Sequence, residues 1–83
     1  MKLDIRYFAW LRERVGTASE QVETDAATVA ELIKELGARD EGYAYAFSDT
    51  GSIRAAIDQQ LVEMDAPLAN AREVAFFPPM TGG

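Results

Sequence analysis

The stretch Thr28–Gly37 constrains the fold most, because its spacing predicts a helix with a single buried face. Thr28 and Glu31 have the capping-box spacing that begins a helix, and Gly37 is typical of a helix end. A lone helix with one apolar face needs a second layer to cover it, so the remaining residues should form a sheet. The predicted buried stripe consists of Val29, Leu32, Ile33 and Leu36.

Alternation of apolar and polar residues predicts strands before this helix. Residues 1–8 form a first strand with Leu3, Ile5 and Tyr7 directed inward, which leaves Phe8 directed away from the core. A helical turn through Trp10 should follow and end at a glycine, Gly16. Residues 17–24 predict a weak second strand, and their polar content is typical of a sheet edge.

The second half of the chain predicts three more strands. Residues 38–47 predict only a packed connection, because Tyr43–Phe47 fits either a short helix or an extended cover. Residues 48–51 form a turn, 53–58 a third long strand and 61–62 a short one, before the corner Asn70–Arg72. This order predicts an α+β roll, a mixed sheet covered by one main helix, as a single domain over residues 1–77.

The last eleven residues predict a strand that continues into an extended tail, residues 78–83. In Glu73–Phe77, Val74 and Phe76 lie on one face, and Ala75 and Phe77 on the other. The chain then continues as Pro78, Pro79, Met80, Thr81, Gly82 and Gly83. Prolines favour extended backbone, and six residues at about 3.3 Å each reach roughly 20 Å, enough to enter another protein's active site.

Glycine suits the end of such a tail, since it lacks a Cβ and leaves a terminal carboxyl open to attack. A frayed terminus is the alternative for an isolated Gly-Gly. The apolar strand and the two prolines that lead directly into it favour a functional tail.

Composition argues against an independent enzyme. The 83 residues include no Cys and no His, which excludes a thiol nucleophile, a disulfide, zinc sites of the usual type and a histidine general base. A net charge of −6 argues against nucleic-acid binding through phosphate contacts. No apolar run is long enough to span a membrane and no secretory signal is evident, so we expect a cytoplasmic protein that contacts neither membrane nor nucleic acid.

Two adjacent aromatic pairs predict a partner surface. In Tyr7-Phe8 and Phe76-Phe77 only one member of each pair can enter the core, because neighbouring strand residues point to opposite faces. Phe8 and Phe77 should therefore lie outside, with Leu61 as a neighbour. An exposed apolar patch of this kind marks a protein-binding surface; cover by the turn at Trp10 is the alternative.

Four stretches of the chain resemble the small, sulfur-carrying subunits of molybdopterin synthase, the MoaD type. They are IRYFAWLRERVG, TVAEL, AAIDQQLV and, most specifically, VAFFPPMTGG. The chain differs from this family at Asp58, where Asn is frequent, and at Asn70–Arg72, which lacks the usual Gly-Asp.

The resemblance implies a ubiquitin-like β-grasp fold and a carrier without catalytic groups or bound cofactor of its own. An ATP-dependent activating enzyme would adenylate the Gly83 carboxylate, which then becomes a thiocarboxylate. Within a heterotetrameric synthase, the tail from Pro78 to Gly82 would enter the large subunit, which binds the pterin precursor. Phe8, Leu61 and Phe77 would contact the larger partners.

Three alternatives remain open at this stage. A carrier of the same fold could serve thiamine synthesis or tRNA thiolation, and a ubiquitin-like modifier could use the same adenylated terminus to form isopeptide bonds. A plain adaptor, whose sheet binds a partner and whose tail is inert, is the alternative from another class.

Overall fold

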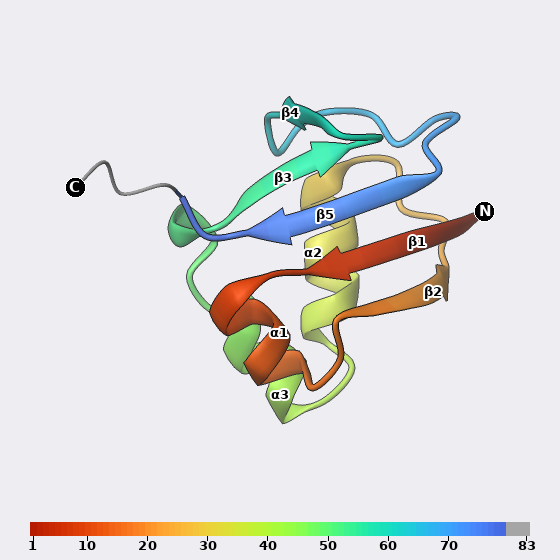
Figure 1. Ribbon diagram of the computed structural model, residues 1–83. Helices are drawn as coiled ribbons and strands as arrows, with labels where there is room; N and C mark the ends of the chain where they lie inside the picture. The colour runs from red at the N-terminus through yellow and green to blue at the C-terminus, as the bar shows by residue number, and fades with distance from the viewer. Residues whose placement is uncertain (80–83) are drawn as a thin grey trace.

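The computed structural model describes residues 1–79, in which five strands form one sheet with α2 packed across one face (Figure 1). The strands are β1 (Lys2–Tyr7), β2 (Ser19–Glu23), β3 (Arg54–Ile57), β4 (Gln60–Val62) and β5 (Glu73–Phe77). The helices are α1 (Ala9–Val15), α2 (Val29–Gly37) and α3 (Glu41–Ala46), with a 3-10 helix, η1, at Thr50–Ser52. None of the helices in the described residues is long and apolar enough to cross a membrane.

The sheet has the order β2-β1-β5-β3-β4, which places the first and last strands of the chain side by side at its centre. β1 and β5 run parallel, from Asp4 opposite Glu73 to Tyr7 opposite Phe76. The other three strand pairs are antiparallel. The predicted mixed sheet is therefore confirmed, as is β2 as an edge strand, and the arrangement is the β-grasp roll that the resemblance implied.

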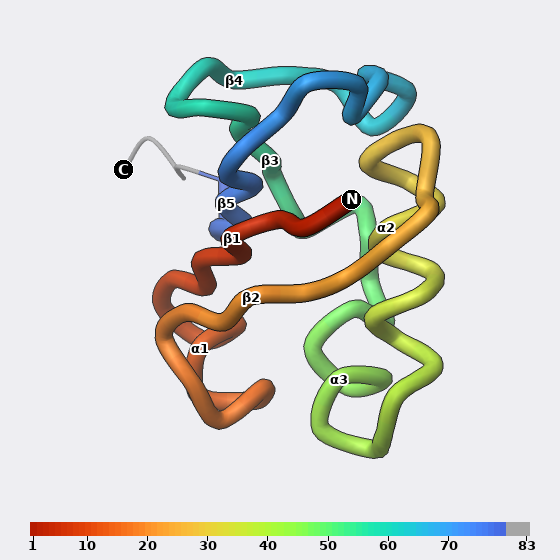
Figure 2. Tube along the Cα trace, turned by 90° about the vertical axis from the view of Figure 1, so that its right-hand side faces the viewer, coloured from red at the N-terminus to blue at the C-terminus, as the bar shows by residue number. Residues whose placement is uncertain are grey.

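One hydrophobic core lies between the sheet and α2. Figure 2 shows α2 on one side of the strands, and its four predicted stripe residues are buried. Leu3, Ile5 and Tyr7 of β1 face the same core, as predicted. At the start of α2 the Thr28 hydroxyl accepts the Glu31 N–H at 3.2 Å, so half of the capping box is present as predicted. In a full capping box the Glu31 carboxylate would accept the backbone N–H of Thr28. Here it accepts a hydrogen bond from the Thr28 hydroxyl instead, at 3.4 Å.

Two connections became clear only in three dimensions. Residues 41–46 form α3, which begins after Asp40, whose carboxylate accepts the Tyr43 N–H at 3.1 Å. The predicted third strand over residues 53–58 was too long, since β3 ends at Ile57. Asp58 and Gln59 have positive φ angles of 48° and 72° and form the tight turn into β4.

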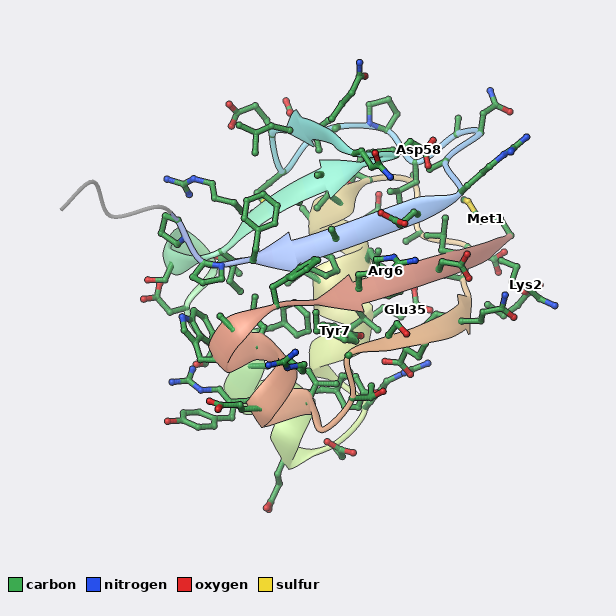
Figure 3. All side chains as sticks on the ribbon, viewed as in Figure 1. Met1, Lys2, Arg6, Tyr7, Glu35 and Asp58 are labelled. Atoms are coloured by element: carbon green, nitrogen blue, oxygen red, sulfur yellow. The ribbon has the colours of Figure 1, made fainter. Side chains whose placement is uncertain are left out.

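Asp58 joins this turn to the corner before β5. Its carboxylate accepts the N–H groups of Arg72 and Glu73, at 3.0 and 2.9 Å, and it lies beside the start of β5 (Figure 3). Asn70 has a positive φ of 67° and supplies the sharp bend of the corner. The positions at which the chain differs from the MoaD type thus still form closed, hydrogen-bonded turns.

Candidate functional site: the outer sheet face at the base of the tail

The sheet face opposite α2 carries the predicted partner surface. The N–H of Phe8 donates to the carbonyl of Phe76 at 3.1 Å, which extends the parallel β1–β5 pairing by one step and places Phe8 beside Phe77. The chain leaves the strand immediately afterwards, because Ala9 takes a positive φ of 54° at the start of α1. Phe8 remains 48% exposed, so the turn at Trp10 does not cover it.

Leu61 lies on the same face, two strands away from β5. It is opposite Ala56 of β3, and Ala56 is opposite Ala75 of β5. Side chains of directly opposed residues point to the same side of a sheet, so Leu61, Ala56 and Ala75 form one row across the outer face. Leu61 is 69% exposed, and Phe77 is half-buried. The predicted outward positions of Phe8, Leu61 and Phe77 are confirmed, and we call these three residues the outer patch; its binding role remains a prediction.

The tail begins at the edge of this patch. β5 ends at Phe77, and Pro78 and Pro79 follow it without further strand pairing, both half-buried. The predicted tail residues Met80, Thr81, Gly82 and Gly83 lie outside the described residues.

The base of the tail rests on a cluster of aromatic rings on the inner face. Phe76 stacks on Tyr7 with a centroid distance of 6.3 Å and meets Phe47 edge to face at 5.2 Å. Tyr7 also meets Tyr43 edge to face at 6.4 Å. Such pairs add to the stabilisation from burial alone. Phe76 is therefore held on several sides, which fixes the position of β5 just before it ends at Phe77.

A polar network closes the cluster at the β2 edge, and sequence reasoning missed it. The Glu20 carboxylate accepts hydrogen bonds from the hydroxyls of Tyr7 and Tyr43, at 2.8 and 2.7 Å. Arg39 donates to the same carboxylate at 3.1 Å. Glu20 lies opposite Ile5 and therefore on the inner face. Its spacing of two from the core residue Val22 was the signal that could have revealed this position.

The pKa values follow from these contacts. Burial tends to raise the pKa of Glu20, but the hydrogen bonds from Tyr43, Tyr7 and Arg39 outweigh it and lower the pKa below the ordinary value. Burial, together with the hydrogen bond to Glu20, raises the pKa of Tyr7. The network thus consists of the ion pair between Glu20 and Arg39, and the two neutral tyrosine hydroxyls donate hydrogen bonds to the Glu20 carboxylate.

The described residues show an exposed apolar patch and no metal-type cluster of side chains. Within residues 1–79 no three His, Cys, Asp or Glu side chains converge to hold a metal ion. A hollow of about 270 Å³ lies beside Leu61, between η1 and β4, and is lined by Arg54 and Leu61 as well as by the core residue Ile53. The geometry therefore places an exposed apolar patch beside the end of β5.

Comparisons with known proteins give this geometry a context. The chain matches the ThiS family over residues 5–83. It is 43% identical to the molybdopterin synthase sulfur carrier subunit of Escherichia coli, over 98% of this chain and 99% of that protein. It is also 30% identical to small archaeal modifier protein 3 of Haloferax volcanii, over the full length of both.

A solved structure extends the comparison at the level of the fold. One chain in the complex of subunits 1 and 2 of the molybdopterin-converting factor from Helicobacter pylori superposes with a TM-score of 0.66. It is 21% identical in sequence, and the match covers 100% of both chains. This similarity supports the β-grasp assignment.

Proposed function

The chain belongs to the ThiS family, and from this premise we propose that it is the sulfur carrier of a molybdopterin synthase. The observation that carries the proposal is the 43% identity to the Escherichia coli carrier subunit, which extends over almost the whole of both chains. The structure adds an exposed apolar patch at the point where β5 leads into the tail. A carrier needs both features, since it must dock on a partner and deliver its terminus into that partner's active site.

The proposed chemistry takes place at Gly83. Its carboxylate attacks the α-phosphate of ATP on an activating enzyme, pyrophosphate leaves, and an acyl adenylate forms. Hydrosulfide, or a donor of sulfur at the same oxidation level, then attacks the carbonyl carbon and displaces AMP, which leaves a thiocarboxylate. Adenylation is needed because a carboxylate is a poor electrophile. The thiocarboxylate sulfur attacks a carbon of the pterin precursor and displaces an oxygen substituent there, and water then cleaves the bond between the Gly83 carbonyl carbon and the sulfur, which restores the carboxylate.

The described residues would act in this cycle by binding and orientation. The outer patch would dock on the large subunit and, at another stage, on the activating enzyme. Pro78 and Pro79 would direct Met80, Thr81 and Gly82 toward the partner's active site. The large subunit would bind the pterin precursor and supply the catalytic groups, in the cytoplasm. The pairing of two subunits in the Helicobacter pylori complex supports such a partner.

A ubiquitin-like modifier is the second candidate, because the chain is 30% identical to an archaeal modifier protein. Both functions begin with adenylation of the terminus and differ in the group that attacks it. A modifier would form larger conjugates through lysine amines, whereas a carrier would gain sulfur at Gly83. Gel analysis of cell extract and the intact mass of the purified chain distinguish the two.

The proposal is tested by adding one alanine after Gly83. The addition leaves the outer patch unchanged but moves the reactive carboxyl by about 3.5 Å, and a misplacement of about 1 Å can cost on the order of a hundredfold in rate. We expect a chain that folds and binds the large subunit as before, but accepts neither AMP nor sulfur. Gly82→Val should behave alike, since the added side chain crowds the approach to the carboxyl.

The measurements are ATP–pyrophosphate exchange with the activating enzyme and pterin sulfuration by the reconstituted synthase. The unextended chain is the control, and its C-terminal peptide should gain the mass difference between sulfur and oxygen. Wild-type rates for the extended chain would contradict the carrier mechanism and favour an adaptor with an inert tail.

A further inference from the structure

Arg54 occupies the middle of the surface that a docking partner must cover. β3 lies between β5 and β4 in the sheet, and Arg54 is directly opposite Phe77. The two side chains therefore share the outer face, and Arg54 is exposed. Leu61 lies beyond it on β4, and Arg54 and Leu61 line the same hollow of about 270 Å³. A partner that covers both Phe77 and Leu61 must pass over Arg54.

Two other arginines near this surface already have partners within the chain. Arg6 lies on the outer face and is labelled in Figure 3; its Nε contacts the Glu73 carboxylate at 2.8 Å. Arg14 of α1 lies between two aromatic rings, 4.4 Å from Trp10 and 3.8 Å from Tyr45. Their charges are therefore engaged before any partner binds.

Arg54 differs from both. Its guanidinium makes one hydrogen bond within residues 1–79, to the backbone carbonyl of its own neighbour Ile53 at 3.4 Å. No carboxylate of the described residues lies within 4.0 Å of it, although Glu63 lines the same hollow. Covering an unpaired charge with protein is unfavourable unless the covering surface supplies an opposite charge.

We propose that Arg54 pairs with a carboxylate on the large subunit and thereby selects that partner on the outer patch. This inference rests on the proposed function. The partner surface would then combine an apolar area for Phe8, Leu61 and Phe77 with at least one Asp or Glu placed over β3. The charge adds specificity because a neutral or basic surface at the same place would leave Arg54 covered and unpaired.

The test compares Arg54→Gln with Arg72→Gln by titration calorimetry against the purified large subunit at low and high salt. Both variants remove one exposed arginine charge, but Arg72 precedes β5, about 16 Å along the chain from Phe77. We expect Arg54→Gln to raise Kd by about tenfold or more and to flatten its salt dependence, because truncating one partner of a covered charge pair is costly. Arg72→Gln should change Kd by less than about twofold, as for a charge outside the interface.

The outcomes separate this inference from the function on which it rests. If the unaltered chain binds and the two variants have the same affinity and salt slope, the role of Arg54 is wrong while the carrier function stands. If the unaltered chain does not bind the large subunit at all, both fail. Chemical unfolding of each variant provides the control, and we expect no change because the Arg54 side chain is exposed.

Discussion

The two faces of the sheet carry neighbouring aromatic residues with opposite roles. On the inner face Tyr7 and Phe76 are 2% and 0% exposed and stack in the core. On the outer face, each one residue further along the chain, Phe8 is 48% exposed and Phe77 is half-buried. A single step along a strand therefore separates a ring that stabilises the core from a ring that we propose contacts a partner, because successive side chains alternate between the faces.

The largest expected effect tests the inner face. Phe76→Ala removes a fully buried ring that contacts Tyr7 and Phe47, and we expect a loss of about 3–5 kcal/mol in the free energy of unfolding. Urea titration measures this loss. The matched variant Phe77→Ala should cost about 1–1.5 kcal/mol, since its ring is only half-buried. Equal losses at the two positions would show that the faces do not divide the roles in this way.

The next effect tests the outer face. Phe77→Asp replaces an apolar ring of the proposed interface with a carboxylate, so we expect the Kd for the large subunit to rise by about 30-fold or more while the chain still folds. Ala30→Asp is the control, because it adds the same charge at an exposed position of α2, on the other side of the sheet. Calorimetric titration that finds unchanged binding for Phe77→Asp would remove the outer patch as the docking surface.

The smallest effect concerns Glu20, which supports the inner face. The pKa of Glu20 is lower in the folded chain than in the unfolded chain, so its carboxylate binds a proton more readily when the chain is unfolded. The resulting stability is present above the ordinary pKa of Glu, about 4.3, and is lost as the pH falls through the lower folded value. Glu20→Gln should therefore cost about 1–2 kcal/mol at pH 7 and lose less further stability on acidification than the unaltered chain does.

Urea titrations between about pH 7 and pH 3 measure this difference. Glu23→Gln, an exposed position on the same strand, is the control and should follow the unaltered chain. Parallel stability curves for the Glu20→Gln variant and the unaltered chain would contradict the structural role of the network. Binding of the large subunit at pH 7 should be unaffected by either variant.

Sequence reasoning predicted most of the elements because their signals are local. The apolar stripe of α2 and the inward residues of β1 follow from helix and strand periodicity alone. The same alternation predicted that Phe8 and Phe77 would lie outside. Residues 43–47 were ambiguous, because their alternating tyrosines and alanines fit either a helix or an extended segment, and the structure forms α3 over residues 41–46. The predicted length of β3 was wrong, because the alternation of apolar and polar residues continues to Asp58, where the turn of Asp58 and Gln59 ends the strand.

The sequence by itself determined the alternating strands, the capped helix, the proline and glycine tail, and the absence of Cys and His. Only the tertiary structure decided which residues meet. The parallel pairing of β1 with β5 brings Tyr7 opposite Phe76, Arg54 lies beside Phe77, and Glu20 reaches two tyrosines on different elements. Periodicity specifies the face to which a side chain points, whereas its neighbours depend on strand order and register, which are set by how the whole chain packs into one core.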